Sequence, residues 1–300
     1  MDFHATCQNR AALPDSSPLN ELKIILVSDF HNCIDPEIRP WMPGGAYCAT
    51  ERRELVIRTL KNNNADLTIW LGDLVDRGHV PSYRPIDQAM QQSQLPGDVF
   101  VTPGNHDIRE VLRDNVRSDT PTDICTDGQK THYLIKRGKH NLFVLDSAPV
   151  DEFEANGAAA NISQFGKVGQ EWLRGTLDSM EQGAAAWVFT HYPANNFNQS
   201  WITGSAMMRD GDDLHAILVA HQSKVGGVFS GHLHHAFSWT RDDINYHSLI
   251  PASVALTLDR SKDKQQIVED TEGFPGVEAL TLRGSKDYSR RSLPILSRSD

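Results

Sequence analysis

The chain has 300 residues, 39% of them hydrophobic, which is enough to build one large domain or two modest ones around its own core. Its 29 basic and 39 acidic residues give a formal net charge of −10 at pH 7. Because nucleic-acid duplexes and anionic membranes attract basic surfaces, this charge argues against both as partners.

The first 20 residues, with Pro14 and Pro18 among small polar side chains, predict a flexible arm. They lack a basic stretch followed by an apolar one, so we expect no signal peptide, and no apolar run approaches the roughly 20 residues that a membrane span needs. The four cysteines include no C-x-x-C pair, which is typical of a reducing cytosol, although a bridge between Cys33 and Cys48 stays open. We therefore expect a cytoplasmic protein without a membrane partner.

Six short apolar runs predict buried strands, because they are continuous and rich in branched residues. They cover 22–27, 67–71, 99–102, 141–146, 185–190 and 225–230. Amphipathic spacing predicts helices over 51–63, 168–180 and 212–223, the first with Thr50 as a candidate N-cap. The later stretches AFSWTRD, INYHSL and VEALTLRG predict further strands. This alternation favours an α/β fold with a sheet-rich second half, of the α+β kind.

Two long connections interrupt the pattern, from Asn32 to Ala49 and from Pro193 to Asp210. Loops of this length in a compact domain are often lids or binding walls. The alternative for either one is a tolerated surface insertion.

Side chains that can bind metals follow five of the six predicted strands. They are Asp29 and His31, then Asp73, then Asn105, then His191, and finally His232 and His234. In α/β sheets, ligands bind at the carboxyl ends of the strands, so we expect these groups to meet. The spacing of two residues within Asp29/His31 and His232/His234 would place each pair on one face of an extended backbone. Gly72, Gly104 and Gly231 allow tight turns or close backbone approach beside them.

The series D-x-H, G-D-x-x-D, G-N-H-D, H and G-H-x-H, which runs from Asp29 to His234, resembles that of the calcineurin-like metallophosphoesterase superfamily. The resemblance implies a β-sandwich of two mixed sheets flanked by helices. It also implies a dinuclear site with seven ligands: Asp29, His31 and His234 for the first metal, Asn105, His191 and His232 for the second, and Asp73 bridging the two.

We expect the chain to be divided into three parts. Residues 1–20 form the arm, 21–258 the catalytic domain, and 259–300 a C-terminal extension. Three alternatives stay open for this extension: further strands packed on the domain, a cover over the site, or a dimer arm.

The chemistry of the ligands agrees with such a centre. Mixed imidazole and oxygen ligands suit manganese, iron, cobalt or zinc better than magnesium or calcium. Two such ions, roughly 3.5–4 Å apart, can hold a bridging hydroxide and stabilise its in-line attack on phosphorus. A bound divalent ion lowers the pKa of its water enough to supply hydroxide near neutral pH. No nucleophilic serine or cysteine is then needed.

His106 matches a family histidine that is not a ligand but lies over the substrate, where it stabilises developing charge or protonates the leaving oxygen. Asp76 matches the carboxylate that orients this histidine, and a surface pair of Asp76 with Arg77 is the alternative. Four other histidines are interpreted as structural or as part of solvated loops: His79, His215, His235 and His247.

The stretch GDLVDRG is similar to the protein serine/threonine phosphatases, but two positions differ. Those enzymes carry an arginine before G-N-H, where this chain has Pro103, and they end the motif in Glu rather than Asp107. With LDSAP, GKVGQEWL, THYPA and VFSGHLH, the chain is more similar to the branch of class III cyclic-nucleotide phosphodiesterases and glycerophosphodiesterases. We therefore expect a phosphodiesterase whose substrate is a small phosphoester such as a cyclic nucleotide or a glycerophosphodiester.

Other functions share parts of this pattern. A phosphomonoesterase or nucleotide pyrophosphatase would use the same metals and differ in its pocket walls. A nuclease would need a basic groove, which the composition does not favour. A non-catalytic binding module of the same fold would be expected to lose ligands or His106, and none is missing. The identity of the metal and the oligomeric state, including a homo-oligomer, stay open.

Overall fold

The computed structural model describes residues 6–9, 21–32, 50–76, 78, 80–116, 118–149, 163–194, 206–253, 256–259, 266–269 and 276–295. The first strands are β1 (Thr6–Asn9), β2 (Leu22–Val27), β3 (Leu67–Leu71), β4 (Asp98–Thr102), β5 (Asp123–Asp127), β6 (Lys130–Arg137) and β7 (His140–Leu145). The later ones are β8 (Ala185–Thr190), β9 (Val225–Ser230), β10 (Phe237–Arg241), β11 (Ile244–Ser248), β12 (Leu256–Asp259), β13 (Gln266–Glu269), β14 (Gly276–Leu282) and β15 (Tyr288–Pro294). The helices are α1 (Thr50–Asn62), α2 (Val80–Ser93), α3 (Arg109–Asn115), α4 (Gly166–Ser179) and α5 (Gly211–Ala220).

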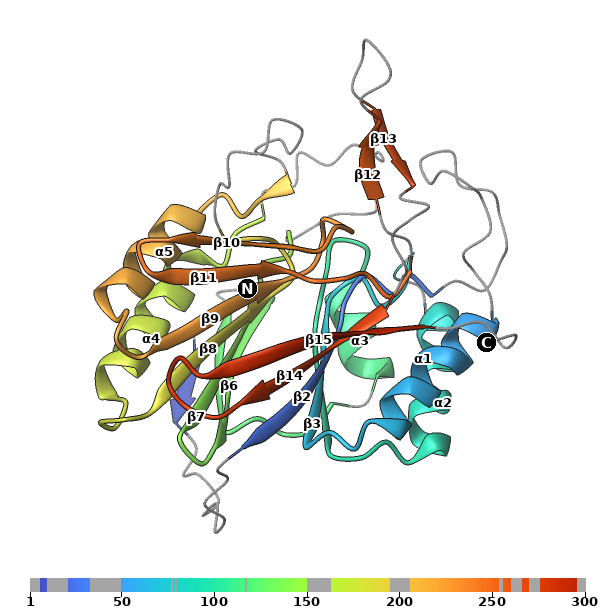
Figure 1. Cartoon of the computed structure of the whole chain (residues 1–300), viewed down its shortest axis with the longest axis horizontal. Helices are drawn as coiled ribbons and strands as arrows, with labels where there is room; N and C mark the ends of the chain where they lie inside the picture. Colours follow the sequence, from blue (N-terminus) through green and yellow to red (C-terminus); the bar gives the residue numbers. More distant parts are fainter. Residues whose placement is uncertain are drawn as a thin grey trace.

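Two mixed sheets form the centre of the molecule (Figure 1). The larger has the strand order β1-β5-β6-β7-β8-β9-β11-β10, parallel from β7 to β11 and antiparallel outside that range. The smaller has the order β15-β14-β2-β3-β4, with β2, β3 and β4 parallel. Strands β12 and β13 pair only with each other among the described residues, in a hairpin that stands away from both sheets (Figure 1).

The period-two alternation of the strands explains why the sheets stack. Ile24 and Leu26 of β2 lie in the core between the sheets, together with Trp187 of β8. Their neighbours Ile25 and Val27 lie in a second core that contains residues of α1, α2 and α3. A third core joins α4 and α5 to the opposite face of the larger sheet. The result is four layers, helices–sheet–sheet–helices, so the predicted β-sandwich of two mixed sheets flanked by helices is confirmed.

The six strands predicted from apolar runs are present, each within one residue of the expected ends, and the three predicted helices form α1, α4 and α5. The sequence analysis missed α2, in which Pro81 and Pro85 argue against a helix. Pro81 lies in the first turn, where its missing N–H has no intrahelical partner to lose. Burial of Tyr83 and Ile86 compensates for the donor that is lost at Pro85.

Both terminal segments contribute strands. β1 lies within the expected arm and pairs with β5, while β14 lies within the expected extension and pairs antiparallel with β2. The C-terminal segment therefore completes the smaller sheet through β14 and β15. The division at 20 and 258 stays a prediction.

The structure differs from the expectation that the cysteines are reduced. Cys125 in β5 is disulfide-bonded, and the register of β1 places Cys7 directly opposite it. Disulfides are rare in the cytosol, so this finding weighs against the cytoplasmic location, which stays a prediction. The Cys33–Cys48 bridge lies outside the described residues, as do most of the two long connections. None of the described helices is long and apolar enough to cross a membrane.

Candidate metal centre

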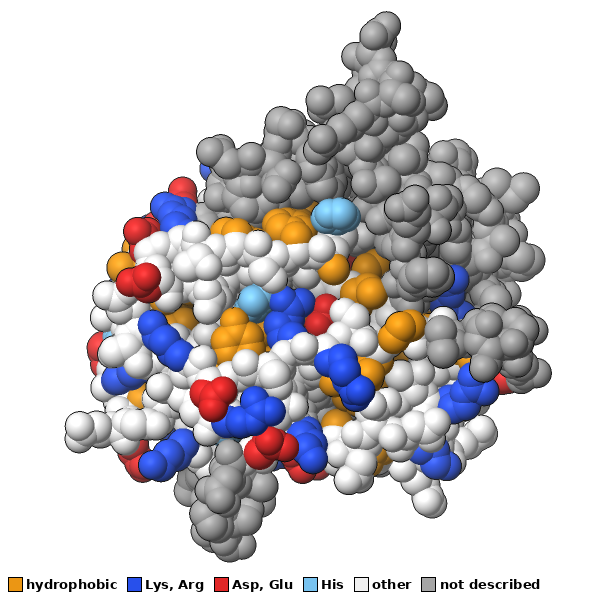
Figure 2. Space-filling view, viewed as in Figure 1, with side chains coloured by type: hydrophobic (Ala, Val, Ile, Leu, Met, Phe, Trp, Pro, Cys, Tyr) orange, Lys and Arg blue, Asp and Glu red, His pale blue; other side chains and the backbone are white. Residues whose placement is uncertain are grey.

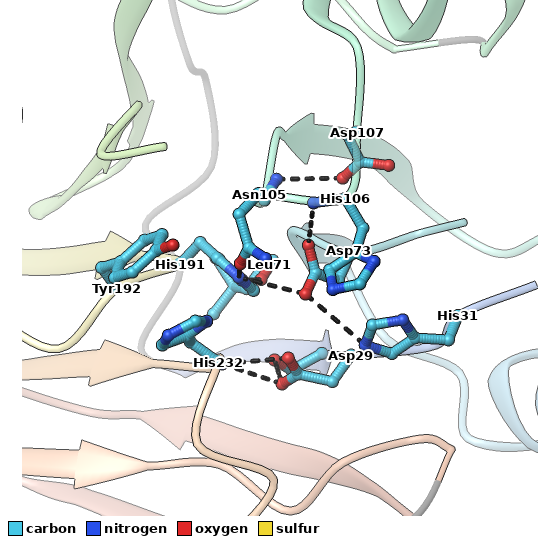
Figure 3. Close-up of polar contacts among 12 residues, drawn as sticks. Asp29, His31, Leu71, Asp73, Asn105, His106, Asp107, His191, Tyr192 and His232 are labelled. Carbon is cyan, nitrogen blue, oxygen red and sulfur yellow. Dashed lines mark hydrogen bonds and ion pairs between the residues drawn. The ribbon is translucent and has the colours of Figure 1, made fainter. Parts of the chain in front are cut away.

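The candidate ligands lie at one edge of the sandwich, where strands from both sheets end (Figure 3). The smaller sheet contributes Asp29 and His31 after β2, Asp73 after β3 and Asn105 after β4; the larger sheet contributes His191 after β8, and His232 and His234 after β9. The site thus lies across the interface of the two sheets. All seven residues are buried or half-buried.

The backbone at these positions differs from the extended conformation that the sequence analysis assumed. Five candidate ligands have left-handed φ angles: Asp29 (52°), His31 (48°), Asp73 (52°), His232 (69°) and His234 (52°). Each such residue costs about 1–2 kcal/mol, and nine described non-glycine residues have positive φ. Left-handed turns beyond the strand ends, rather than a shared strand face, therefore bring the paired residues together. Strained backbone concentrated in this way is typical of a functional site.

Three glycines let the ligand loops approach closely. A Cβ on Gly72 would lie 2.6 Å from Cγ of His191, and one on Gly104 would lie 2.8 Å from Cγ of Asp73. A Cβ on Gly231 would overlap Ser28 Oγ and lie 2.8 Å from Asp29 Oδ2. The ligand side chains therefore fill space that only glycine leaves open.

One cluster of donor atoms joins Asp29, His31, Asp73 and His234, all within 4.8 Å of one another. His31 Nε2 lies 3.0 Å from His234 Nε2 and 3.5 Å from Asp73 Oδ2. His234 Nε2 lies 3.5 Å from Asp29 Oδ1. Two imidazole nitrogens and two carboxylates converging at these distances match the ligand chemistry of a divalent transition metal.

A second cluster joins Asp73, His191 and His232, again within 4.8 Å. His191 Nε2 lies 3.4 Å from Asp73 Oδ2 and 3.2 Å from Asn105 Oδ1. The two clusters share Asp73 (Figure 3), so the residues present fit two cations bridged by one carboxylate.

Hydrogen bonds outside the clusters orient these ligands. His191 Nδ1–H donates to the carbonyl oxygen of Leu71 at 2.8 Å, which directs Nε2 toward Asp73. The backbone N–H of His232 lies 3.0 Å from each carboxylate oxygen of Asp29, and Ser28 Oγ donates to the same carboxylate. The ring of Tyr192 lies against that of His232, with centroids 3.9 Å apart.

The electrostatics of the clusters favour cation binding. Burial lowers the pKa of His31 and of His232 well below the ordinary value, so both imidazoles are neutral. Burial alone would raise the pKa of Asp73, but the imidazoles around it, His191 first among them, hold it well below its usual range. Burial alone would lower the pKa of His191, whereas the Asp73 carboxylate raises it to about 9. A cation that replaces this positive charge therefore displaces a proton from His191.

His106 lies beside the centre and is half-buried. Its backbone N–H donates to Asp73 Oδ1 at 2.9 Å, and its Nδ1–H donates to the backbone carbonyl of Asp76 at 2.9 Å. The carboxylate of Asp76 lies 3.6 Å from His31 Nδ1, and Asp76, His31 and His106 each offer a possible ligand atom within 4.8 Å of the other two. Asp76 thus contacts His106 through its main chain, and the expectation that its carboxylate orients this histidine stays a prediction.

The sequence analysis missed two residues that hold the ligand loops together. The buried carboxylate of Asp107 accepts hydrogen bonds from the N–H groups of Gly104 (2.9 Å) and Leu74 (3.3 Å) and from the hydroxyl of Tyr83 (3.0 Å). It therefore ties the loop of Asn105 to the loop of Asp73. The place of Asp107 in G-N-H-D was a usable signal, whereas Tyr83 lies on the helix that the sequence did not reveal.

The remaining histidines have other contacts. His215 lies 2.6 Å from the Tyr246 hydroxyl and 2.9 Å from Asp242 Oδ2. His247 lies 2.6 Å from the Tyr288 hydroxyl, away from the ligand clusters. These contacts agree with structural roles, while His79 and Arg77 lie outside the described residues.

Comparison with known proteins agrees with this geometry. Residues 22–236 match the family described as calcineurin-like phosphoesterase, and no curated protein matches the chain. A dimetal phosphatase from Danio rerio has 12% identity and a TM-score of 0.60, over 90% of this chain and 98% of its own. The purple acid phosphatase PPD1 from yellow lupin (Lupinus luteus) has 12% identity and a TM-score of 0.61, over 92% of this chain but 52% of its own. GAP50, the anchor in the inner membrane complex of Plasmodium, has 10% identity and a TM-score of 0.57, over 92% and 85%.

At such identities the solved structures establish a shared fold only. The family match covers most of the chain and contains all seven candidate ligands. Together with the two clusters that share Asp73, it supports a metal-dependent phosphoester hydrolase. The chain belongs to the calcineurin-like phosphoesterase family.

Proposed function

We propose that the chain is a phosphodiesterase that hydrolyses small phosphodiesters with two divalent cations, with His106 assisting the leaving group. The observation that carries the proposal is the pair of donor clusters that share Asp73. Asp29, His31 and His234 hold one cation, and Asn105, His191 and His232 hold the other. When bound, manganese, iron, zinc or cobalt ions lower the pKa of water and neutralise charge on a phosphoryl group.

His106 supports a general-acid role because of where its two ring nitrogens lie. Its Nδ1–H donates to the carbonyl of Asp76, which fixes the orientation of the ring, and the proposal assigns the general-acid step to Nε2. The ring centroid of His106 lies 4.7 Å from that of His31. The same side chain therefore stands within reach of the groups that would position the phosphorus.

Two features favour diesters over monoesters. Pro103 and Asp107 stand where the serine/threonine phosphatases carry Arg and Glu. Two divalent cations with Asp29, Asp73 and a hydroxide leave a small positive charge, which suits a phosphodiester monoanion. The phosphatases among the structures of similar fold favour the second candidate, a phosphomonoesterase.

A small-molecule substrate is favoured over a nucleic-acid duplex. On the face in Figure 2, Lys and Arg side chains are interspersed with Asp and Glu side chains. Neither this mixture nor the net charge of −10 favours the binding of a polyanion.

The test uses metal-free protein reconstituted with manganese and assayed on bis(p-nitrophenyl) phosphate and on p-nitrophenyl phosphate. We expect metal-dependent hydrolysis that prefers the diester. His106→Ala should lower the diester rate, by less than the about 10²- to 10⁴-fold that a general acid usually contributes, because p-nitrophenolate is a good leaving group. His235→Ala is the matched control, because His235 neighbours a candidate ligand and is in contact with Phe237 instead. A preference for the monoester would favour the phosphatase, and hydrolysis that does not depend on metal would contradict both.

A further inference from the structure

A buried ion pair outside the ligand clusters joins the loop of His106 to the larger sheet. Arg109, the first residue of α3, donates from Nε and Nη2 to the two carboxylate oxygens of Asp146, both at 2.8 Å. Nη1 donates to the carbonyl oxygen of Pro149 (2.5 Å), and Nη2 donates also to that of Ala148 (2.6 Å). Asp146 directly follows β7 and is 1% exposed. This bidentate geometry fixes orientation as well as distance.

The pair completes a closed series of contacts that includes His106 and the candidate ligands Asn105 and His191. Arg109 follows His106 by three residues, with only Asp107 and Ile108 between them. On the other side, Ser147 next to Asp146 accepts hydrogen bonds from Thr190 Oγ1 (2.7 Å) and from the backbone N–H of Tyr192 (3.0 Å).

Those two residues flank His191 in the chain. His191 Nε2 in turn lies 3.2 Å from Asn105 Oδ1, beside His106. Contacts therefore run from His106 through Arg109 and Asp146 to His191 and back.

We propose that Arg109 and Asp146 are positioning residues for His106, fixing where its imidazole stands relative to the ligands of the larger sheet. This inference rests on the proposed function for its catalytic consequence. Arginine suits the role because its planar fork holds the carboxylate in one orientation, whereas lysine binds as a point charge. Buried ion pairs add little net stability compared with apolar residues of similar size, so their value lies in geometry.

A second pair provides a matched control. Arg137 at the end of β6 also forms an ion pair with an aspartate, Asp98 at the start of β4. This pair too joins the two sheets. It lies at the first residue of β4, whereas the loop of Asn105 follows the other end of that strand. Arg137→Lys therefore makes the same chemical change away from the site.

The activity test compares diesters whose leaving groups range from p-nitrophenol to phenol, the weaker acid. Poor leaving groups need the general acid most, so Arg109→Lys should slow the phenyl diester about 10- to 100-fold, with a smaller loss on the p-nitrophenyl diester and an unchanged KM. Arg109→Lys combined with His106→Ala should be no slower than His106→Ala alone. Asp146→Asn should behave like Arg109→Lys, and Arg137→Lys should match the wild-type protein. Equal losses on both substrates, or a further loss in the double variant, would overturn the proposal.

A measurement without turnover separates this inference from the proposed function. Histidine-selective NMR, with the His106 signal assigned from His106→Ala, should show that signal shifted in Arg109→Lys and unchanged in Arg137→Lys. An unshifted His106 signal would overturn the positioning role even if the enzyme is active. If the signal shifts but the wild-type protein hydrolyses no phosphoester, the positioning role stands and the proposed function fails.

Discussion

Replacing Gly231 by alanine tests the close approach of the ligand loops. The added methyl carbon would overlap Ser28 Oγ and lie 2.8 Å from Asp29 Oδ2 and 3.2 Å from the carbonyl oxygen of Leu71. The carbonyl oxygen of Leu71 belongs to the backbone of β3, a fully buried strand, and the carboxylate of Asp29 accepts a hydrogen bond from the backbone N–H of His232. Neither Asp29 Oδ2 nor the carbonyl oxygen of Leu71 can yield without moving a ligand or the sheet.

Overpacking of this kind costs about 1–3 kcal/mol. Since two of the three crowded atoms are fixed, we expect Gly231→Ala to lower the free energy of unfolding by about 2 kcal/mol, close to 30-fold in the unfolding equilibrium. Adding Ser28→Ala removes the first overlap, so the double variant should be less destabilised than the sum of the single variants, by about 1 kcal/mol. The methyl of Gly231→Ala should also weaken Mn²⁺ binding, because it crowds the candidate ligand Asp29. In the double variant the Mn²⁺ affinity should recover only in part, because this contact with Asp29 remains.

The assay is urea unfolding of the metal-free protein followed by tryptophan fluorescence, with a calorimetric Mn²⁺ titration of each variant. Gly227→Ala, in the preceding strand β9, is the control, because its added methyl would meet its nearest neighbour at 3.5 Å, an ordinary contact. We expect the control to stay within about 1 kcal/mol of the wild-type protein. The reasoning would be refuted if the two glycine variants had equal stability and equal Mn²⁺ affinity, or if the effects of Gly231→Ala and Ser28→Ala simply added.

Three further predictions address separate parts of the structure. Tyr83→Phe removes a hydroxyl that is hydrogen-bonded to Asp107 and to the N–H of Ile108, so the free energy of unfolding should fall by about 1–3 kcal/mol. Urea unfolding measures this change, and an unchanged midpoint would contradict a stabilising role of these hydrogen bonds. Burial lowers the pKa of His132 to about 4, so the unfolded chain binds more protons than the folded one between pH 6.5 and 4. As the pH falls through this window, the free energy of unfolding should decrease by up to about 3 kcal/mol, and His132→Gln should flatten this dependence. Equal slopes for the two proteins would contradict the prediction. Asp76→Asn keeps the carbonyl that binds His106 but loses the carboxylate near His31. The affinity for Mn²⁺ should therefore fall about 10- to 100-fold, while the dependence of the rate on the leaving group stays unchanged. Unchanged Mn²⁺ affinity with an altered leaving-group dependence would show that the carboxylate acts on His106.

The positions of the ligands were predictable because their signals are local. Each candidate ligand follows an apolar run, and buried strands are the plainest pattern in the sequence. The fold followed from the same alternation together with the resemblance. The spacing within Asp29/His31, however, led to the right pairing for the wrong reason. Both residues occupy left-handed turns, a backbone state that side-chain periodicity does not encode.

Contacts between distant segments were beyond the sequence. Arg109 and Asp146 are 37 residues apart, and nothing in either neighbourhood marks the other as its partner. Likewise β14 inserts beside β2 across most of the chain, because the open edge of β2 needs hydrogen-bond partners that only tertiary packing selects. The turn before Asp76 is a further example, since its Leu74 and Val75 N–H groups donate to the carboxylate of Asp107, more than 30 residues away.

The most direct test of the account is an anomalous difference map from crystals of the manganese-loaded protein. We predict two peaks, one in contact with Asp29, His31 and His234 and the other with Asn105, His191 and His232, with Asp73 touching both. A single peak, or peaks away from these side chains, would contradict the dinuclear centre on which the proposed function rests.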